Sequence, residues 1–114
     1  MKSSTTMDHL VDRIRDILDG DPRIAEKRMF GGLSFLLNGR ILVAANKDGR
    51  ILLSIGKENN DEALARPGAT QMIQGDKVMR GFIWVDADAI EDDDALRDWV
   101  ETAERWVAQM PVKD

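Results

Sequence analysis

The sequence predicts an α+β domain in which helices pack against an antiparallel sheet. Three apolar runs, residues 33–37, 41–45 and 51–55, follow one another with Asn38-Gly39 and Asp48-Gly49 between them. These dipeptides tolerate the positive φ angles of tight hairpin turns, so the three runs are expected to form a β-meander. Amphipathic helical patterns stand near both ends of the chain, and two further strand patterns precede the last helix.

The N-terminal segment has the spacing of an amphipathic helix. Its apolar positions are Met7, Leu10, Val11, Ile14, Ile17 and Leu18. Gly20 and Pro22 are expected to end this helix, and a hydroxyl side chain at one of residues 4–6 is expected to cap its start. Asp8 is then placed in the first turn, where a carboxylate complements the helix dipole.

Two-residue turns would determine the register of the meander and the direction of its side chains. The expected pairs are Leu37 with Arg40, Phe35 with Leu42, Leu33 with Ala44, Ala44 with Leu53 and Leu42 with Ile55. One face then carries Leu33, Phe35, Leu37, Leu42, Ala44, Ile51, Leu53 and Ile55, and the other carries Ser34, Leu36, Ile41, Val43, Ala45, Leu52 and Ser54. The second face is more apolar than a solvated antiparallel sheet usually is. We expect either a second helix layer or a partner subunit to cover it.

The segments around the meander have shorter patterns. Residues 26–30 are expected to be extended, as a strand or an edge segment, and Gly31-Gly32 to form a corner. A phosphate loop is disfavoured there because no Gly-Lys-Ser/Thr follows and the next element is a strand. Residues 61–65 are expected to form a short helix that Asn60 caps and that Arg66-Pro67-Gly68 ends.

The last third of the chain alternates strand and helix patterns. Residues 70–73 and 78–85 read as strands around a turn at Gly75-Asp76, and apolar residues on both faces of the longer strand indicate a central position in the sheet. A second amphipathic helix follows and ends at Pro111. Its apolar stripe is Leu96, Trp99, Val100, Ala103, Trp106, Val107 and Met110.

The acidic residues 86–94 are the one cluster that suggests a metal site. The glycine and the final glutamate of an EF-hand loop are missing, and carboxylates at a helix start also cap backbone N–H groups. We therefore expect capping and no metal. The sequence has one histidine, His9, and no cysteine or tyrosine, so no catalytic residues and no cofactor are expected.

Charge is unevenly distributed in this 114-residue chain, whose formal net charge is −5. Residues 23–57 hold seven Lys or Arg against two acids, while residues 86–114 hold ten acids against three Lys or Arg. Binding that depends on phosphate neutralisation favours basic proteins, so specific DNA binding is not expected. A chain of 114 residues is expected to form a single domain, over residues 1–114. No membrane-spanning run, signal segment or disulfide framework is recognised, which predicts a cytoplasmic location.

One stretch of the meander resembles a known family. Arg28-Met29-Phe30-Gly31-Gly32, with Phe35 and Asn38-Gly39 behind it, is similar to the N-terminal domain of the TfoX/Sxy competence regulators. Later segments agree with this resemblance: Glu62-Ala63-Leu64, Arg66-Pro67-Gly68-Ala69 and Met79-Arg80-Gly81. The resemblance spans roughly residues 10–111 and implies a two-layer, secretion-chaperone-like fold in the order α-β-β-β-α-β-β-α.

The resemblance also implies a function. It suggests a bacterial, non-enzymatic regulator that acts with a transcription activator or RNA polymerase through protein contacts. Full-length members carry a second, helix-hairpin-helix domain that these 114 residues lack, so a stand-alone domain with a different or broader role is expected. A dimeric chaperone-like adaptor or a small-ligand-binding module remains the alternative, and a homodimer is expected. The candidate interaction surface consists of Arg28, Arg40, Arg80, Leu36 and Val43.

Overall fold

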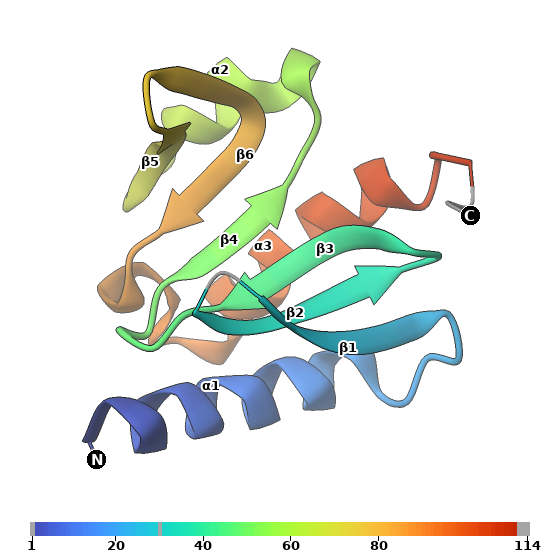
Figure 1. Ribbon diagram of the computed structural model, residues 1–114, viewed down its shortest axis with the longest axis vertical. Helices are drawn as coiled ribbons and strands as arrows, with labels where there is room; N and C mark the ends of the chain where they lie inside the picture. The colour runs from blue at the N-terminus through green and yellow to red at the C-terminus, as the bar shows by residue number, and fades with distance from the viewer. Residues whose placement is uncertain (1, 30, 112–114) are drawn as a thin grey trace.

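The computed structural model describes residues 2–29 and 31–111, with side chains from Met7 onward. Phe30, which was expected to end the first extended segment, lies outside the described residues. The predicted α-β-β-β-α-β-β-α order is confirmed, and the extended segment before the meander forms an additional strand (Figure 1). The elements are α1 (Lys2–Leu18), β1 (Ile24–Met29), β2 (Gly32–Leu37), β3 (Arg40–Ala45), β4 (Ile51–Ser54), η1 (Lys57–Asn59), α2 (Asn60–Leu64), β5 (Ala69–Gln74), β6 (Lys77–Val85), η2 (Ala87–Ile90) and α3 (Asp93–Val107).

All six strands form one antiparallel sheet in the order β1-β2-β3-β4-β6-β5. β6 lies between β4 and β5, so its predicted central position is confirmed. β1 and β5 are the two edge strands. Gly31 has a φ of +71° in the turn between β1 and β2, which agrees with the predicted glycine corner.

The core lies between one face of this sheet and the helices. Ile14 from α1, Phe35, Leu42 and Leu53 from the meander, and Leu96 from α3 belong to one cluster, and each is 0% exposed. The prediction that Phe35, Leu42 and Leu53 face the helices is therefore confirmed. Because α1 and α3 share this cluster, the domain has two layers, and the expected alternative of a second helix layer on the other face is wrong (Figure 1).

The predicted register of β3 is wrong in two places. The structure pairs Phe35 with Val43 rather than with Leu42, because a bulge interrupts the β2–β3 ladder between Phe35 and Leu36. The loop after β3 is also one residue longer than predicted, since the backbone N–H of Asn46 donates to the carbonyl oxygen of Arg50. The bulge and the longer loop shift the register in opposite directions. The core-facing residues of β2 and β4 were therefore predicted correctly.

Residues of β3 beyond the bulge therefore have reversed faces. Val43 and Ala45 point into the core, and Ala44 lies on the opposite face. On the second face, Leu36, Ile41, Val43 and Leu52 were expected to form an apolar patch that the two amphipathic helices leave exposed. This expectation is wrong for two of them, because Val43 is 0% exposed and Leu52 is 1% exposed.

Three predictions at helix ends also need correction. α1 begins at Lys2, so residues 4–6 lie within the helix and Asp8 lies beyond its first turn. Asn60 is the first residue of α2 and does not cap it. α3 ends at Val107, before the predicted Met110, but its start is as expected because the Asp92 carboxylate accepts a hydrogen bond from the backbone N–H of Ala95.

Ion pairs hold α1 against its neighbours. The guanidinium of Arg15 donates to both carboxylate oxygens of Glu26 in β1, and this interaction lowers the pKa of Glu26. Arg13 binds the Asp93 carboxylate and the carbonyl oxygen of Ile90, at 2.9 and 2.6 Å. These contacts place α1 across β1 and the start of α3. Among the described residues, no helix has the length and apolar character needed to span a membrane.

Candidate functional site

The sheet opens between β3 and β4 on the side where β3 begins. The two strands pair only from Val43 to Ala45, although β3 starts at Arg40. Figure 1 shows β3 and β4 diverging there, with the C-terminal end of α3 passing behind the opening. Side chains from this end of α3 therefore reach residues of the sheet face that the helices do not cover.

A groove of about 300 Å³ lies at this opening, and we call it the outer groove. Its lining residues come from β1 to β4, β6 and the end of α3. They are Lys27, Met29, Leu36, Gly39, Arg40, Ile41, Ser54, Phe82, Trp106, Val107 and Met110.

The outer groove combines apolar side chains with two cations. Leu36, Ile41 and Phe82 are each half-buried, so each presents apolar surface to the groove. Lys27 and Arg40 supply the positive charge. The position of Arg40 is held because its Nε donates to the carbonyl oxygen of Pro111 at 2.8 Å.

Trp106 is placed in the outer groove by close packing on Gly56. A Cβ atom added at Gly56 would lie 2.6 Å from the indole ring, and Gly56 has a φ of +86°. Only glycine combines this backbone conformation with space for the ring. The Trp106 side chain therefore forms a wall that the outer groove shares with a second hollow.

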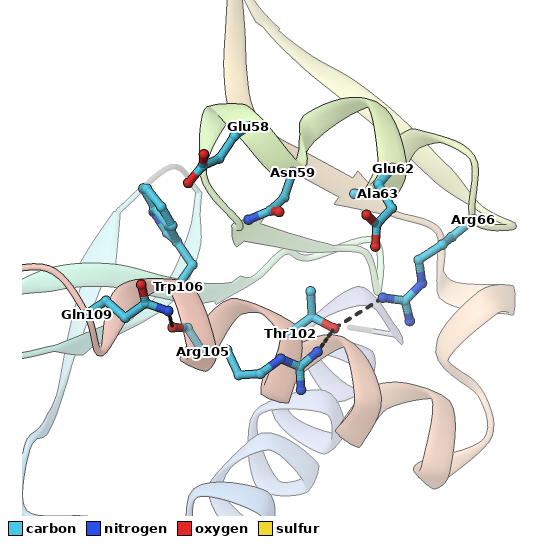
Figure 2. A pocket seen from close by; sticks show the side chains of 9 residues that line it. All are labelled: Glu58, Asn59, Glu62, Ala63, Arg66, Thr102, Arg105, Trp106 and Gln109. Atoms are coloured by element: carbon cyan, nitrogen blue, oxygen red, sulfur yellow. Dashed lines mark hydrogen bonds between the residues drawn. The ribbon is translucent and has the colours of Figure 1, made fainter.

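The second hollow, of about 370 Å³, lies between α2 and α3 and is called the helix cleft (Figure 2). Arg66 and Arg105 both donate to the hydroxyl oxygen of Thr102, at 3.2 and 3.3 Å. Glu58 and Glu62 extend from the opposite wall. The hydroxyl of Thr102 in turn donates to the carbonyl oxygen of Asp98, so its hydrogen-bonding capacity is used within the protein.

Arg66 has a structural role in the helix cleft. Its guanidinium lies 3.5 Å from the centre of the Trp99 ring and also binds the Asp98 carboxylate. This arrangement connects the segment after α2 to α3 through a cation–π contact, an ion pair and a hydrogen bond. The polar groups of Arg66 and Thr102 are thus used to hold α2 and α3 together. The outer groove is therefore the stronger candidate for binding.

The structure brings together only part of the predicted interaction surface. Leu36 and Arg40 line the outer groove. Arg28 lines a different hollow with Asp8 and Asp12 of α1, and Arg80 lies 3.6 Å from Asp61 of α2. Val43 is wrong as a surface residue because it is completely buried.

Sequence reasoning placed only Leu36 and Arg40 of the outer groove on the interaction surface, and the residues that it missed include Lys27, Ile41, Phe82 and Trp106. Lys27 and Ile41 were assigned to the right segments but not to the interaction surface. Phe82 and Trp106 are far from the meander in sequence, so no local pattern could link them to Leu36. Ile41 was already assigned with Leu36 to the second face of the meander, and this assignment was the signal that could have linked it to the interaction surface.

The described residues contain no group of three or more His, Cys, Asp or Glu side chains arranged to hold a metal ion. His9 is exposed on α1. The outer groove presents apolar and cationic groups, which can bind a complementary surface by burial and charge.

A family model for the TfoX N-terminal domain matches residues 16–106, from within α1 to the last turn of α3. The chain belongs to the TfoX N-terminal domain family. No curated protein and no solved structure matches the chain. In this TfoX N-terminal domain, the matched region contains all residues of the outer groove except Val107 and Met110.

Proposed function

We propose that this protein is a non-enzymatic regulatory domain that acts in transcription regulation through contacts with another protein. The observation that supports this proposal is the outer groove, in which Leu36, Ile41 and Phe82 lie beside Lys27 and Arg40. Interfaces of this kind bury apolar groups at the centre and use charge for steering and specificity.

The occupant that fits the outer groove is a protein segment with apolar and acidic side chains. Apolar side chains would cover Leu36 and Ile41, and carboxylates would pair with Lys27 and Arg40. Nucleic acid is a poorer match because the whole chain has a net charge of −5. Membership of the TfoX N-terminal domain family makes a transcription activator or RNA polymerase the expected source of this segment.

Affinity capture from the native host tests this proposal with two matched charge reversals. Lys27→Glu changes the outer groove, and Lys47→Glu makes the same change at an exposed residue of the loop between β3 and β4. The expected result is that the wild type and Lys47→Glu capture RNA polymerase subunits or a transcription activator, identified by mass spectrometry. Lys27→Glu is expected to lose them.

Two outcomes would contradict the proposal. Equal capture of the transcription protein by Lys27→Glu and Lys47→Glu would show that the outer groove is not the contact. Capture of unfolded or nascent chains alone would instead favour the chaperone-like adaptor. Circular dichroism of both variants serves as the folding control, because each substitution replaces an exposed side chain.

A further inference from the structure

The two edges of the sheet are protected to different degrees. Edge strands present unpaired backbone N–H and C=O groups, and charged side chains usually discourage other strands from pairing with them. β1 carries Glu26, Lys27 and Arg28 at its centre, all exposed. β5, the opposite edge, reads ATQMIQ and has no charged residue. β5 is therefore the edge that is open to strand pairing.

The hairpin of β5 and β6 also exposes apolar surface. Ile73 and Val78 pair directly across this hairpin and are 60% and 53% exposed. They are the most exposed of the large apolar side chains described. Neither lines the outer groove, so this surface is separate from the one in the proposed function.

We propose that β5 pairs antiparallel with β5 of a second copy of this chain, which joins the two sheets into one. An antiparallel pair of identical strands is related by a two-fold axis, and this arrangement closes after two copies. Like charges facing each other across paired strands are destabilising. An uncharged strand can face itself without this cost, even in a chain of net charge −5.

The two-fold axis must pass between two copies of the same residue, because opposed residues share a face and side chains alternate along each strand. The register centred on Met72 pairs residues 70–74 of the two copies and places Ile73 of one copy opposite Gln71 of the other. Pairing therefore brings a second strand against the exposed Ile73 side chain. A foreign extended peptide would satisfy the same backbone groups, but only a second copy brings a second exposed Ile73 to the interface.

The first test measures mass by sedimentation equilibrium from low to high micromolar concentration. The wild type is expected to show the mass of a dimer at high concentration, and Ile73→Lys the mass of a monomer throughout. Ala25→Lys adds the same charge to an exposed position on β1 and is expected to dimerise like the wild type. A wild type that stays monomeric, or an Ile73→Lys variant that still dimerises, would refute the proposal.

The second test locates the axis, using the absence of cysteine from the chain. In the proposed register, Met72→Cys places its two thiols beside the axis, within the roughly 4.4–6.8 Å Cα separation that a disulfide requires. Gln74→Cys places its Cα atoms about four residues apart along the strands, or roughly 13 Å. Oxidation is expected to cross-link Met72→Cys efficiently and Gln74→Cys poorly. Equal cross-linking of the two, or none in either, would exclude this pairing.

Discussion

Two residues have structural roles that no other residue type at their positions would serve. The absence of a Cβ atom at Gly56 leaves space for the Trp106 ring, and the Asn60 side chain connects α2 to β5 and β6. Asn60 is 0% exposed, its Oδ1 accepts from the backbone N–H of Gly81 at 2.8 Å, and its Nδ2 donates to Gln71 at 2.7 Å. The Gln71 side chain in turn donates to the carbonyl oxygens of Met79 and Phe82. These side chains satisfy backbone groups where the β5–β6 ladder is interrupted.

Gly56→Ala is expected to reduce the free energy of unfolding by about 2–4 kcal/mol, because it adds a clash with Trp106 to the strain of a positive φ. Gly75→Ala is the matched control. Gly75 has a φ of +62° and no atom within 4 Å of an added Cβ. Strain alone should reduce the stability of that variant by about 1–2 kcal/mol. Urea unfolding measures both values, and equal losses would show that contact with Trp106 is unimportant.

Asn60→Ala is expected to destabilise the domain by about 1–3 kcal/mol, because the Gly81 N–H loses its acceptor in a buried site. Hydrogen exchange gives a local readout, since the amide of Gly81 should exchange faster in this variant. Asn59→Ala removes an amide of the same size from the neighbouring residue, whose Nδ2 donates to the carbonyl oxygen of Ile55. Unchanged protection of Gly81 in Asn60→Ala would contradict the assigned hydrogen bond.

At the scale of elements, β3 shows how a bulge changes which residues are buried. In an uninterrupted ladder, Val43 and Ala45 would face away from the helices. The bulge turns Val43 into the core, and the longer loop restores the expected faces of β4. As a result, consecutive residues Leu42 and Val43 both belong to the core cluster.

The corrected register of β3 predicts effects of different size for two similar substitutions. Val43→Asp is expected to prevent folding, because a carboxylate at this completely buried position has no partner. Leu36→Asp is expected to fold with reduced stability, because Leu36 is half-buried in the outer groove. Circular dichroism with thermal unfolding distinguishes the two. A folded Val43→Asp variant would instead support the register predicted from two-residue turns, in which Val43 faces away from the core.

At the scale of the whole molecule, the helices cover one face of the sheet, and the basic residues of the meander region lie on different surfaces. Arg28 faces the α1 side, whereas Arg40 lines the outer groove. Arg50 stacks 4.4 Å from the centre of the Trp84 ring and also binds Asp48. The local excess of positive charge therefore does not form one continuous stripe, which is the arrangement that nucleic-acid binding favours.

The isolated domain is expected to show no sequence-specific binding to duplex DNA at physiological salt. An electrophoretic mobility shift with competitor DNA measures this. A specific complex that survives competition and disappears in the Arg28→Ala, Arg40→Ala double variant would contradict the expectation. Lys47→Ala is a control for the loss of one positive charge from an exposed loop.

The sequence by itself determined the features that depend on neighbouring residues. Periodic apolar spacing identified α1 and α3, glycine dipeptides located the hairpins, and alternation predicted the buried sides of β2 and β4. The central position of β6 followed from apolar residues on both of its faces. The acidic start of α3 was recognised as a cap because that interaction spans only three residues.

Only the tertiary structure decided the composition of the outer groove and the burial of Val43. The outer groove joins Leu36, Phe82 and Trp106, which come together only because β3 and β4 diverge over the end of α3. The face of Val43 depends on a one-residue offset, since side chains in a strand alternate with a period of two. A one-residue offset leaves the local sequence pattern unchanged, but it changes which side chains of the strand pack against the helices.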